Sequence, residues 1–234
     1  AKVDWISQHS VLPDYFRQQF YDTGRLFPEF AANIGGGQNI YNFSYYGLYN
    51  PLILPSYLLP FVKMSDYMMA IQLLGLTASV LLMYRWLGKR DFSWKICVGV
   101  AVLFLLAGPV IFHSYNQIMF INYMPFLLTG LWGVDRYFEK QKSGLLTVSI
   151  FLMIMTSFYF SIGGMLVLVL YGIHRYLMVC DEAGEKVSVK SFLTAGLKFS
   201  LYFVLAVLMS GVLLAPTAFA LTGREGEGAA AGLG

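Results

Sequence analysis

The sequence predicts an all-α polytopic integral membrane protein that carries an amphipathic helix in a loop outside the membrane. Apolar residues make up 57% of the 234 residues and charged residues only 12%, and the mean hydropathy is +0.61. A soluble core needs far less apolar material, so lipid is the implied solvent. Several apolar runs are also long enough for a helix to cross a hydrocarbon layer of roughly 30 Å. The net charge of +3 is too small and scattered to indicate a nucleic-acid partner.

Residues 1–65 are predicted to form the first extracytoplasmic loop. A helix with Pro13 in its first turn would stop at Asp22-Thr23-Gly24 and lie in the membrane interface. Its aromatic and aliphatic face would hold Leu12, Tyr15, Phe16 and Phe20. Prolines interrupt residues 52–62, so this run is predicted to be a re-entrant or broken helix. The chain starts without a signal peptide or initiator methionine, and we expect it to be part of a longer protein.

Residues 66–221 are predicted to form a transmembrane bundle of about five or six helices. Residues 145–177 are too long for one ordinary span, and a polar stretch at residues 156–161 predicts two shorter helices that meet near one face. Ser65-Asp66 is a plausible cap for the first span, and Pro216 would end the last. Residues 222–234 are Gly-rich and are predicted to be flexible and extracytoplasmic. The predicted spans are 68–86, 96–112, 118–134, the two halves of 145–177, and 192–215.

Basic residues in the short loops predict the orientation, because Lys and Arg favour the cytoplasmic side. Three basic loops share one side if residues 145–177 form a hairpin. Residues 1–65, the turn at His113, the break at residues 158–161 and the Arg224 segment then face outward. The basic residues concerned are Arg85, Lys89, Arg90 and Lys95, then Arg136, Lys140 and Lys142, then Arg175, Lys186 and Lys190.

The predicted outer side offers acids and arginines suited to transfer chemistry on a lipid-linked substrate. Asp4 is the best candidate for a general base, because it stands closest to the end of an expected preceding membrane helix, near the bilayer surface, although an interfacial acid is usually solvated or caps a helix. Arg17, Arg25 and Arg224 are candidates for binding a phosphate, since guanidinium presents a bidentate fork. Snorkelling toward lipid headgroups is the alternative for each arginine. His113 could hydrogen-bond a phosphate or sugar, or be structural.

Several motifs spread along the chain resemble the bacterial YfhO-type membrane proteins. The loop carries Asp4-Trp5-x-x-Gln8-His9, Gly35-Gly36-Gly37 and Asn50-Pro51. The bundle carries Asn122-Tyr123-Met124-Pro125, Asp135-Arg136-Tyr137, Ser157-Phe158-Tyr159-Phe160 and Tyr171-x-x-x-Arg175-Tyr176. That family is similar to GT-C glycosyltransferases, which transfer a sugar from a polyprenyl-phosphate donor outside the cytoplasmic membrane. The resemblance therefore implies a GT-C-like helical bundle and an enzyme.

The resemblance also implies roles for individual residues. Asp4 matches the acid that deprotonates the acceptor hydroxyl, with inversion at the anomeric carbon, and Arg224 resembles a basic position near the lipid phosphate. We assign the sugar and acceptor to Gln8, His9, Tyr45, Tyr46 and Tyr159, although an aromatic belt at the interface would also explain the tyrosines. The implied partners are the polyprenyl-phosphate sugar, lipoteichoic or wall teichoic acid or another envelope glycopolymer, membrane lipid, and a membrane glycosyltransferase that makes the donor.

Metal chemistry has no support in the sequence. The loop has no Asp-x-Asp pair, and His9, His113 and His174 are too dispersed for a zinc site, so we expect neither a metal nor another cofactor.

Two other functions remain open. A flippase or transporter of a lipid-linked sugar would also use a broken helix and phosphate-binding arginines, and a non-catalytic scaffold would not need Asp4.

Overall fold

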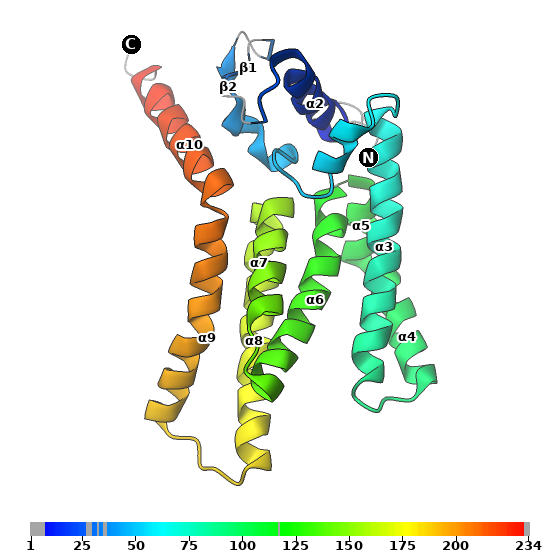
Figure 1. The fold of residues 1–234 in the computed structure, drawn as a ribbon, viewed down its shortest axis with the longest axis vertical. Helices are drawn as coiled ribbons and strands as arrows, with labels where there is room; N and C mark the ends of the chain where they lie inside the picture. Colours follow the sequence, from blue (N-terminus) through cyan, green and yellow to red (C-terminus); the bar gives the residue numbers. More distant parts are fainter. Residues whose placement is uncertain (1–7, 27–29, 32, 35–36, 117, 232–234) are drawn as a thin grey trace.

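The computed structural model describes residues 8–26, 30–31, 33–34, 37–116 and 118–231, and for residues 115 and 223–231 it gives only the course of the backbone. Within these residues the fold is a helical bundle below a compact loop region, so the all-α membrane architecture is confirmed (Figure 1). Four helices are long and apolar enough to cross a membrane, and a bent helix pair can provide a fifth span. The bundle consists of α3 (Met64–Gly88), α4 (Trp94–Leu105), α5 (Gly108–Asn116), α6 (Ile118–Lys140), α7 (Gly144–Thr156), α8 (Phe158–Glu182), α9 (Val189–Met209) and α10 (Gly211–Ala231).

The predicted break within residues 145–177 is present and lies at Ser157. Ser157 ends α7 and begins α8 with an extended backbone, φ −160° and ψ 97°, and its side chain accepts a hydrogen bond from the amide of Phe160. The two helices form a hairpin that turns next to the loop region (Figure 1). They are unequal, because α7 has 13 residues and α8 has 25. At 1.5 Å per residue, α7 is only about 20 Å long and is shorter than a full span.

Two further interruptions occur where the sequence predicted continuous spans. Residues 96–112 are divided between α4 and α5, which meet at an angle of 50°. Pro109 lies in the first turn of α5, where its missing N–H costs no helical hydrogen bond. The last predicted span ends before Pro216, at Ser210, and Pro216 lies within α10. Helix α10 continues to Ala231, through the Gly-rich segment that begins at residue 222.

The loop region begins with the predicted amphipathic helix, α2 (Val11–Thr23). Gly24 ends α2 in the left-handed conformation, with φ 66°, as the Asp-Thr-Gly sequence predicts. The buried residues of α2 are Pro13, Phe16 and Arg17, so its buried face includes an arginine. A short antiparallel pair follows, β1 (Phe30–Ala31) with β2 (Gln38–Asn39).

Residues 40–63 close the loop region with two 3-10 helices, η2 (Ile40–Tyr46) and η3 (Leu54–Leu58). The five residues of η3 take the place of the longer re-entrant helix predicted for residues 52–62. Prolines at positions 51, 55 and 60 remove backbone donors at short intervals, so a longer helix cannot form there. Helix α3 then begins at Met64 after the cap residue Lys63, one residue before the predicted Ser65-Asp66 cap.

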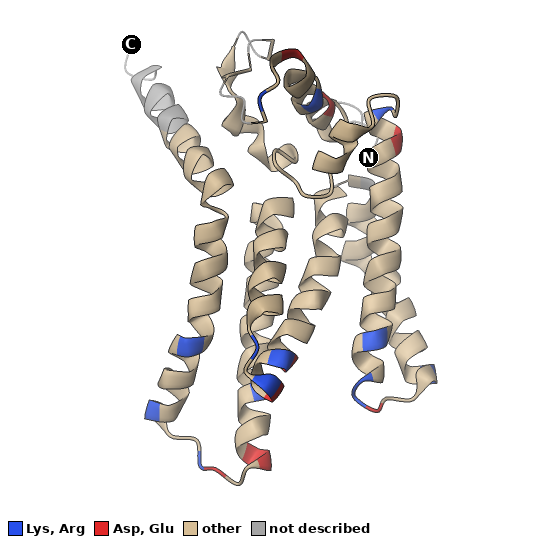
Figure 2. Cartoon of the chain, in the orientation of Figure 1, with Lys and Arg blue, Asp and Glu red and all other residues tan. Residues whose placement is uncertain are grey.

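The basic residues of the three short connections lie together at one end of the bundle, as the sequence predicts. Figure 2 shows Lys and Arg at the α3–α4, α6–α7 and α8–α9 connections, opposite the loop region. We call this the basic end, and the end that carries residues 8–63 the loop end. The core between them includes Leu146, Ile150 and Met153 of α7, all fully buried, packed against α6 and α8.

Candidate functional site

The structure brings five of the predicted sugar- and acceptor-binding residues together at the loop end. The Tyr46 hydroxyl donates a hydrogen bond to Gln8 Oε1 at 2.8 Å. The His9 ring lies edge-on to the Tyr46 ring, with 5.6 Å between centroids, and His9 is 3% exposed. The Tyr45 ring packs against Tyr46 at 5.3 Å and against Tyr159 at 6.3 Å. Loop residues therefore meet the first turn of α8.

The ring contacts continue from this group to His113. Tyr159 lies edge-on to Phe160 at 5.3 Å, and Phe160 lies 5.5 Å from the His113 ring of α5. We name the whole set the loop-end aromatic cluster, and it consists of His9, Tyr45, Tyr46, Phe158, Tyr159, Phe160 and His113, with Gln8 bonded to it. It joins the loop, the α7–α8 break and the end of α5.

Asn50 fixes the loop against the helix break. Its side-chain nitrogen donates to the carbonyl oxygen of Thr156, the last residue of α7, at 3.2 Å. Its side-chain oxygen accepts from the Leu52 amide at 2.9 Å. Asn50 is fully buried, so losing either bond would leave a polar group without water. The position of Tyr45 relative to Tyr159 therefore depends on Asn50.

The cluster offers a surface on which a sugar could lie. The Tyr45 and Tyr159 rings are nearly perpendicular, at 86°, and Tyr159 is 63% exposed. An aromatic face binds the apolar face of a sugar, while phenol and amide groups can bond its hydroxyls. Burial, with Tyr46 and Tyr159 close by, raises the pKa of Tyr45 to about 12. Tyr45 is therefore a neutral hydrogen-bonding group at physiological pH.

Among the remaining predicted residues whose side chains the structure describes, Arg17 and Arg25 do not join the loop-end aromatic cluster. Arg17 is 4% exposed and is held within the fold: its guanidinium bonds Asp14 at 2.7 Å and the Val62 carbonyl at 2.9 Å. These contacts give Arg17 a structural role between α2 and the turn before α3. Arg25 is exposed just after α2. Asp4 lies outside the described residues, and Arg224 belongs to the part of α10 whose side chains are not described.

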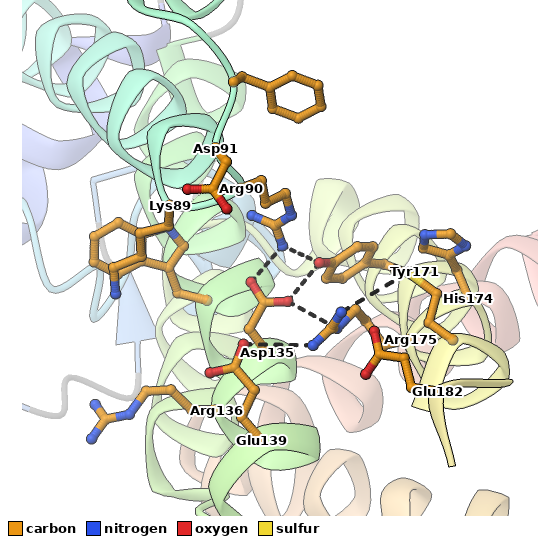
Figure 3. Close-up of a pocket in the computed structure, with 13 residues that line it drawn as sticks. Lys89, Arg90, Asp91, Asp135, Arg136, Glu139, Tyr171, His174, Arg175 and Glu182 are labelled. Carbon is orange, nitrogen blue, oxygen red and sulfur yellow. Dashed lines mark hydrogen bonds and ion pairs between the residues drawn. The ribbon is translucent and has the colours of Figure 1, made fainter. Parts of the chain in front are cut away.

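A second candidate site, at the basic end, was not predicted from the sequence. It is a cavity of about 690 Å³ between the α3–α4 connection, α6 and α8 (Figure 3). At its centre the Asp135 carboxylate pairs with Arg90 at 2.6 Å and with Arg175 at 3.3 Å. The Tyr171 hydroxyl donates to Asp135 at 2.5 Å and also accepts a hydrogen bond from Arg90. We call Arg90, Asp135, Tyr171 and Arg175 the Asp135 network.

The Asp135 network joins the α3–α4 connection to α6 and α8, and these segments are distant in sequence. Arg90 stacks on the Trp86 ring at 3.7 Å, and the Trp86 indole nitrogen donates to Asp135 at 3.1 Å. The only sequence signal was the pair of motifs Asp135-Arg136-Tyr137 and Tyr171-x-x-x-Arg175, which carry charges inside apolar spans. Nothing in the spacing indicated that Arg90 would complete the set.

Neither site contains a metal centre among the residues that the structure describes, since none of their His, Cys, Asp and Glu residues form a group of three able to hold an ion.

Comparison with known proteins gives one match. A family model described as Bacterial membrane protein YfhO matches residues 1–231. No curated protein sequence and no solved structure matches the chain.

Proposed function

Since the chain belongs to the family of the bacterial membrane protein YfhO, we propose that it is a GT-C-type glycosyltransferase. Its donor is a polyprenyl-phosphate-linked hexose or N-acetylhexosamine, and its acceptor is a cell-envelope polymer such as lipoteichoic or wall teichoic acid. The proposed location is the bacterial cytoplasmic membrane, with the loop end outside the cytoplasm. The positive-inside preference supports this orientation, because the three basic connections lie at the opposite end (Figure 2).

The loop-end aromatic cluster is the observation that carries the proposal. Gln8, His9 and Tyr46 come from the loop, whereas Tyr159 comes from α8, more than a hundred residues later. If these aromatic residues only anchored the protein in the membrane interface, they would not need to come together at a helix break. The loop would also not need the buried Asn50 that holds it to Thr156. In the proposed complex the sugar lies against Tyr159 and Tyr45, and Gln8 and Tyr46 bond its hydroxyls.

The proposed reaction is a direct displacement. The Asp4 carboxylate takes the proton of an acceptor hydroxyl, whose oxygen forms a bond to the anomeric carbon. The bond between that carbon and the phosphate oxygen breaks, polyprenyl phosphate leaves, and the configuration at the carbon inverts. Arg25, Arg224 and His113 are the proposed partners of the departing phosphate, because cations and imidazole stabilise its charge. No metal enters this scheme.

The test is sugar transfer by the full-length protein in membrane vesicles, supplied with the polyprenyl-phosphate sugar and teichoic acid. Asp4→Asn should lower the rate by about 10²- to 10⁴-fold, the range expected for a general base. Asp22→Asn is the matched control, since Asp22 is an exposed loop acid at the end of α2. Normal transfer by Asp4→Asn protein would refute the assignment of Asp4.

Binding to the aromatic surface is tested separately. Tyr159→Ala should raise KM for the donor by about 2- to 10-fold, corresponding to the loss of one aromatic contact. Tyr84→Ala is the control, because Tyr84 is also exposed but lies near the basic end of α3. Equal KM values in the two variants would show that the sugar does not bind at Tyr159.

A flippase of the lipid-linked sugar is the alternative, and the same vesicles distinguish it. A transporter's substrate site lies near the middle of the membrane. In the described part of the chain, the ion pairs between helices lie at the basic end instead. Movement of donor lipid across the membrane without any sugar transfer would favour the flippase and overturn the glycosyltransferase.

A further inference from the structure

We propose that the cavity at the basic end binds the phosphodiester headgroup of an anionic phospholipid, through Lys89, Trp132 and Arg136. The proposal concerns the end of the bundle opposite the loop-end aromatic cluster and does not depend on sugar transfer. Three features of the cavity carry it: its depth in the bundle, the hydrogen-bond donors that lack partners, and the charge balance around Asp135.

The cavity lies near the level of lipid headgroups. Its lining on α6 runs from Trp132 to Glu139, and that helix ends at Lys140. Its lining on α8 ends at Glu182, the last residue of that helix. Helix ends mark the boundary of the hydrocarbon layer, where Trp and basic residues meet headgroups. Basic pockets between membrane helices at this depth are suited to lipid phosphates.

Donors on one side of the cavity have no acceptor within the described residues. The Trp132 indole nitrogen is buried and has no hydrogen-bond partner. The Lys89 ammonium lies 4.4 Å from the centre of the Trp132 ring, and neither Lys89 nor Arg136 forms an ion pair with any residue that the structure describes. A buried N–H without a partner costs free energy. A phosphate oxygen would satisfy the Trp132 N–H, while Lys89 and Arg136 would neutralise the charge.

The acids that line the cavity do not pair with Lys89 or Arg136, so these two cations are available to a phosphate. Asp135 is already shared by Arg90 and Arg175, and Glu139 lies 3.5 Å from Arg175 (Figure 3). Two acids remain, Asp91 and Glu182, and both are exposed, so water screens their charge. Phe92 and Met178 in the lining are also exposed, and they offer apolar contacts for acyl chains below a headgroup. A phosphate attached to a lipid therefore fits better than a free phosphate.

The experiment measures retention of phosphatidylglycerol by the purified full-length protein with native mass spectrometry, beside phosphatidylcholine. The wild-type protein should retain phosphatidylglycerol preferentially. The double variant Lys89→Gln, Arg136→Gln should lower its affinity by about tenfold or more, from the loss of two cations near a lipid phosphate. Lys186→Gln with Lys190→Gln is the matched control, since it removes two charges from the basic end outside the cavity.

Trp132→Phe tests the hydrogen bond itself, because it keeps an aromatic ring and removes only the N–H donor. It should weaken retention of phosphatidylglycerol, whereas Trp94→Phe, at an exposed position outside the cavity, should not. Equal losses in the two double variants would show only general attraction to the membrane surface and would overturn the proposal. Equal retention of both lipids would overturn it too. Displacement of phosphatidylglycerol by millimolar inorganic phosphate would identify a soluble anion as the ligand, against a lipid.

Discussion

Replacing Gly133 with alanine should destabilise the protein, because the new Cβ on α6 would collide with the backbone of Leu146 on α7. A Cβ atom at position 133 would lie 2.7 Å from both the Cα and the backbone nitrogen of Leu146. Real Cβ atoms essentially never come within 3.0 Å of another atom, and backbone cannot rotate away as a side chain can. Reaching an ordinary contact of 3.4 Å would require α7 to move by about 0.7 Å.

That movement would disturb the tightly packed side of α7. Ile150 and Met153 are fully buried on the same helix and would shift with Leu146. Overpacking of this kind costs about 1–3 kcal/mol. An alanine in a helix interior returns about 0.5–1 kcal/mol relative to glycine. The packing cost is the larger of the two at Gly133, so we expect a net loss of stability.

Gly163→Ala is the matched control, because a Cβ at Gly163 on α8 would meet no atom within 4 Å. Only the helix preference of alanine acts there, so stability should stay the same or rise slightly. Thermal unfolding of the purified protein in detergent measures both variants. Each kcal/mol corresponds to a Tm change of about 2–4 °C for a domain of this size. A Gly133→Ala protein that is as stable as the Gly163→Ala protein would refute the reasoning.

Three further predictions concern charged and phenolic groups. Asp135→Asn leaves two largely buried arginines without their shared carboxylate and should cost about 3 kcal/mol in the same unfolding measurement. Glu139→Gln should cost less than about 1 kcal/mol, because Glu139 is half exposed, and equal losses would contradict this. Arg17→Met should speed proteolysis at residues 59–63, since the guanidinium bonds the Val62 carbonyl; unchanged cleavage would show that the bond is not needed. The raised pKa of Tyr45, about 12, keeps its phenol neutral beyond the ordinary value of 10.0. The neutral, partly buried Tyr45 phenol therefore contributes to the stability of the folded state below pH 10, and this contribution is lost as the pH rises through about 12. Tyr45→Phe should therefore leave phenolate absorbance between pH 10 and 11 unchanged, and a decrease there would show an unshifted tyrosine.

Local signals predicted the parts of the fold that depend on local chemistry. Asp22-Thr23-Gly24 identified the end of α2, since glycine readily adopts the left-handed conformation found at Gly24. Polar residues at 156–161, together with loop charges, located the α7–α8 break. The bend between α4 and α5 had a signal that was not used, Gly108-Pro109 within an apolar run.

Pro216 was interpreted correctly as a disturbance but assigned the wrong position. A proline ring clashes with the carbonyl four residues earlier and leaves that carbonyl without its helical donor. In the structure α9 ends before that carbonyl, with Ser210 as its cap, and Pro216 lies inside the following helix, which begins at Gly211. The exact site of such a break depends on packing, which one sequence does not reveal.

The sequence suggested residue types for a candidate site but not their arrangement. Aromatic residues in the loop and at the helix break allowed either a sugar-binding surface or an interfacial belt, and only the structure shows that Tyr45 and Tyr159 meet beside the α7–α8 break. The Asp135 network depends on contacts between residues 36 to 81 positions apart, and no periodic pattern records such pairings. Arg17 was predicted to bind a phosphate, but it is buried and bonded within the fold, because an amphipathic pattern does not show which polar residue is buried with its partners.

The positions of the two sites allow their effects to be separated experimentally. Helix α8 contributes to both, with Tyr159 and Phe160 at the loop end and Arg175 at the basic end, where it pairs with Asp135 of α6. Loss of the Asp135 network should lower the amount of folded protein and leave KM of the remaining enzyme unchanged, because the loop-end contacts are held independently through Asn50. A change at Tyr159 should alter KM without altering the unfolding temperature, since that side chain is mostly exposed. If Asp135→Asn changed KM at an unchanged amount of folded protein, the two ends would be coupled through α6 and α8, and the cavity would regulate the transfer site.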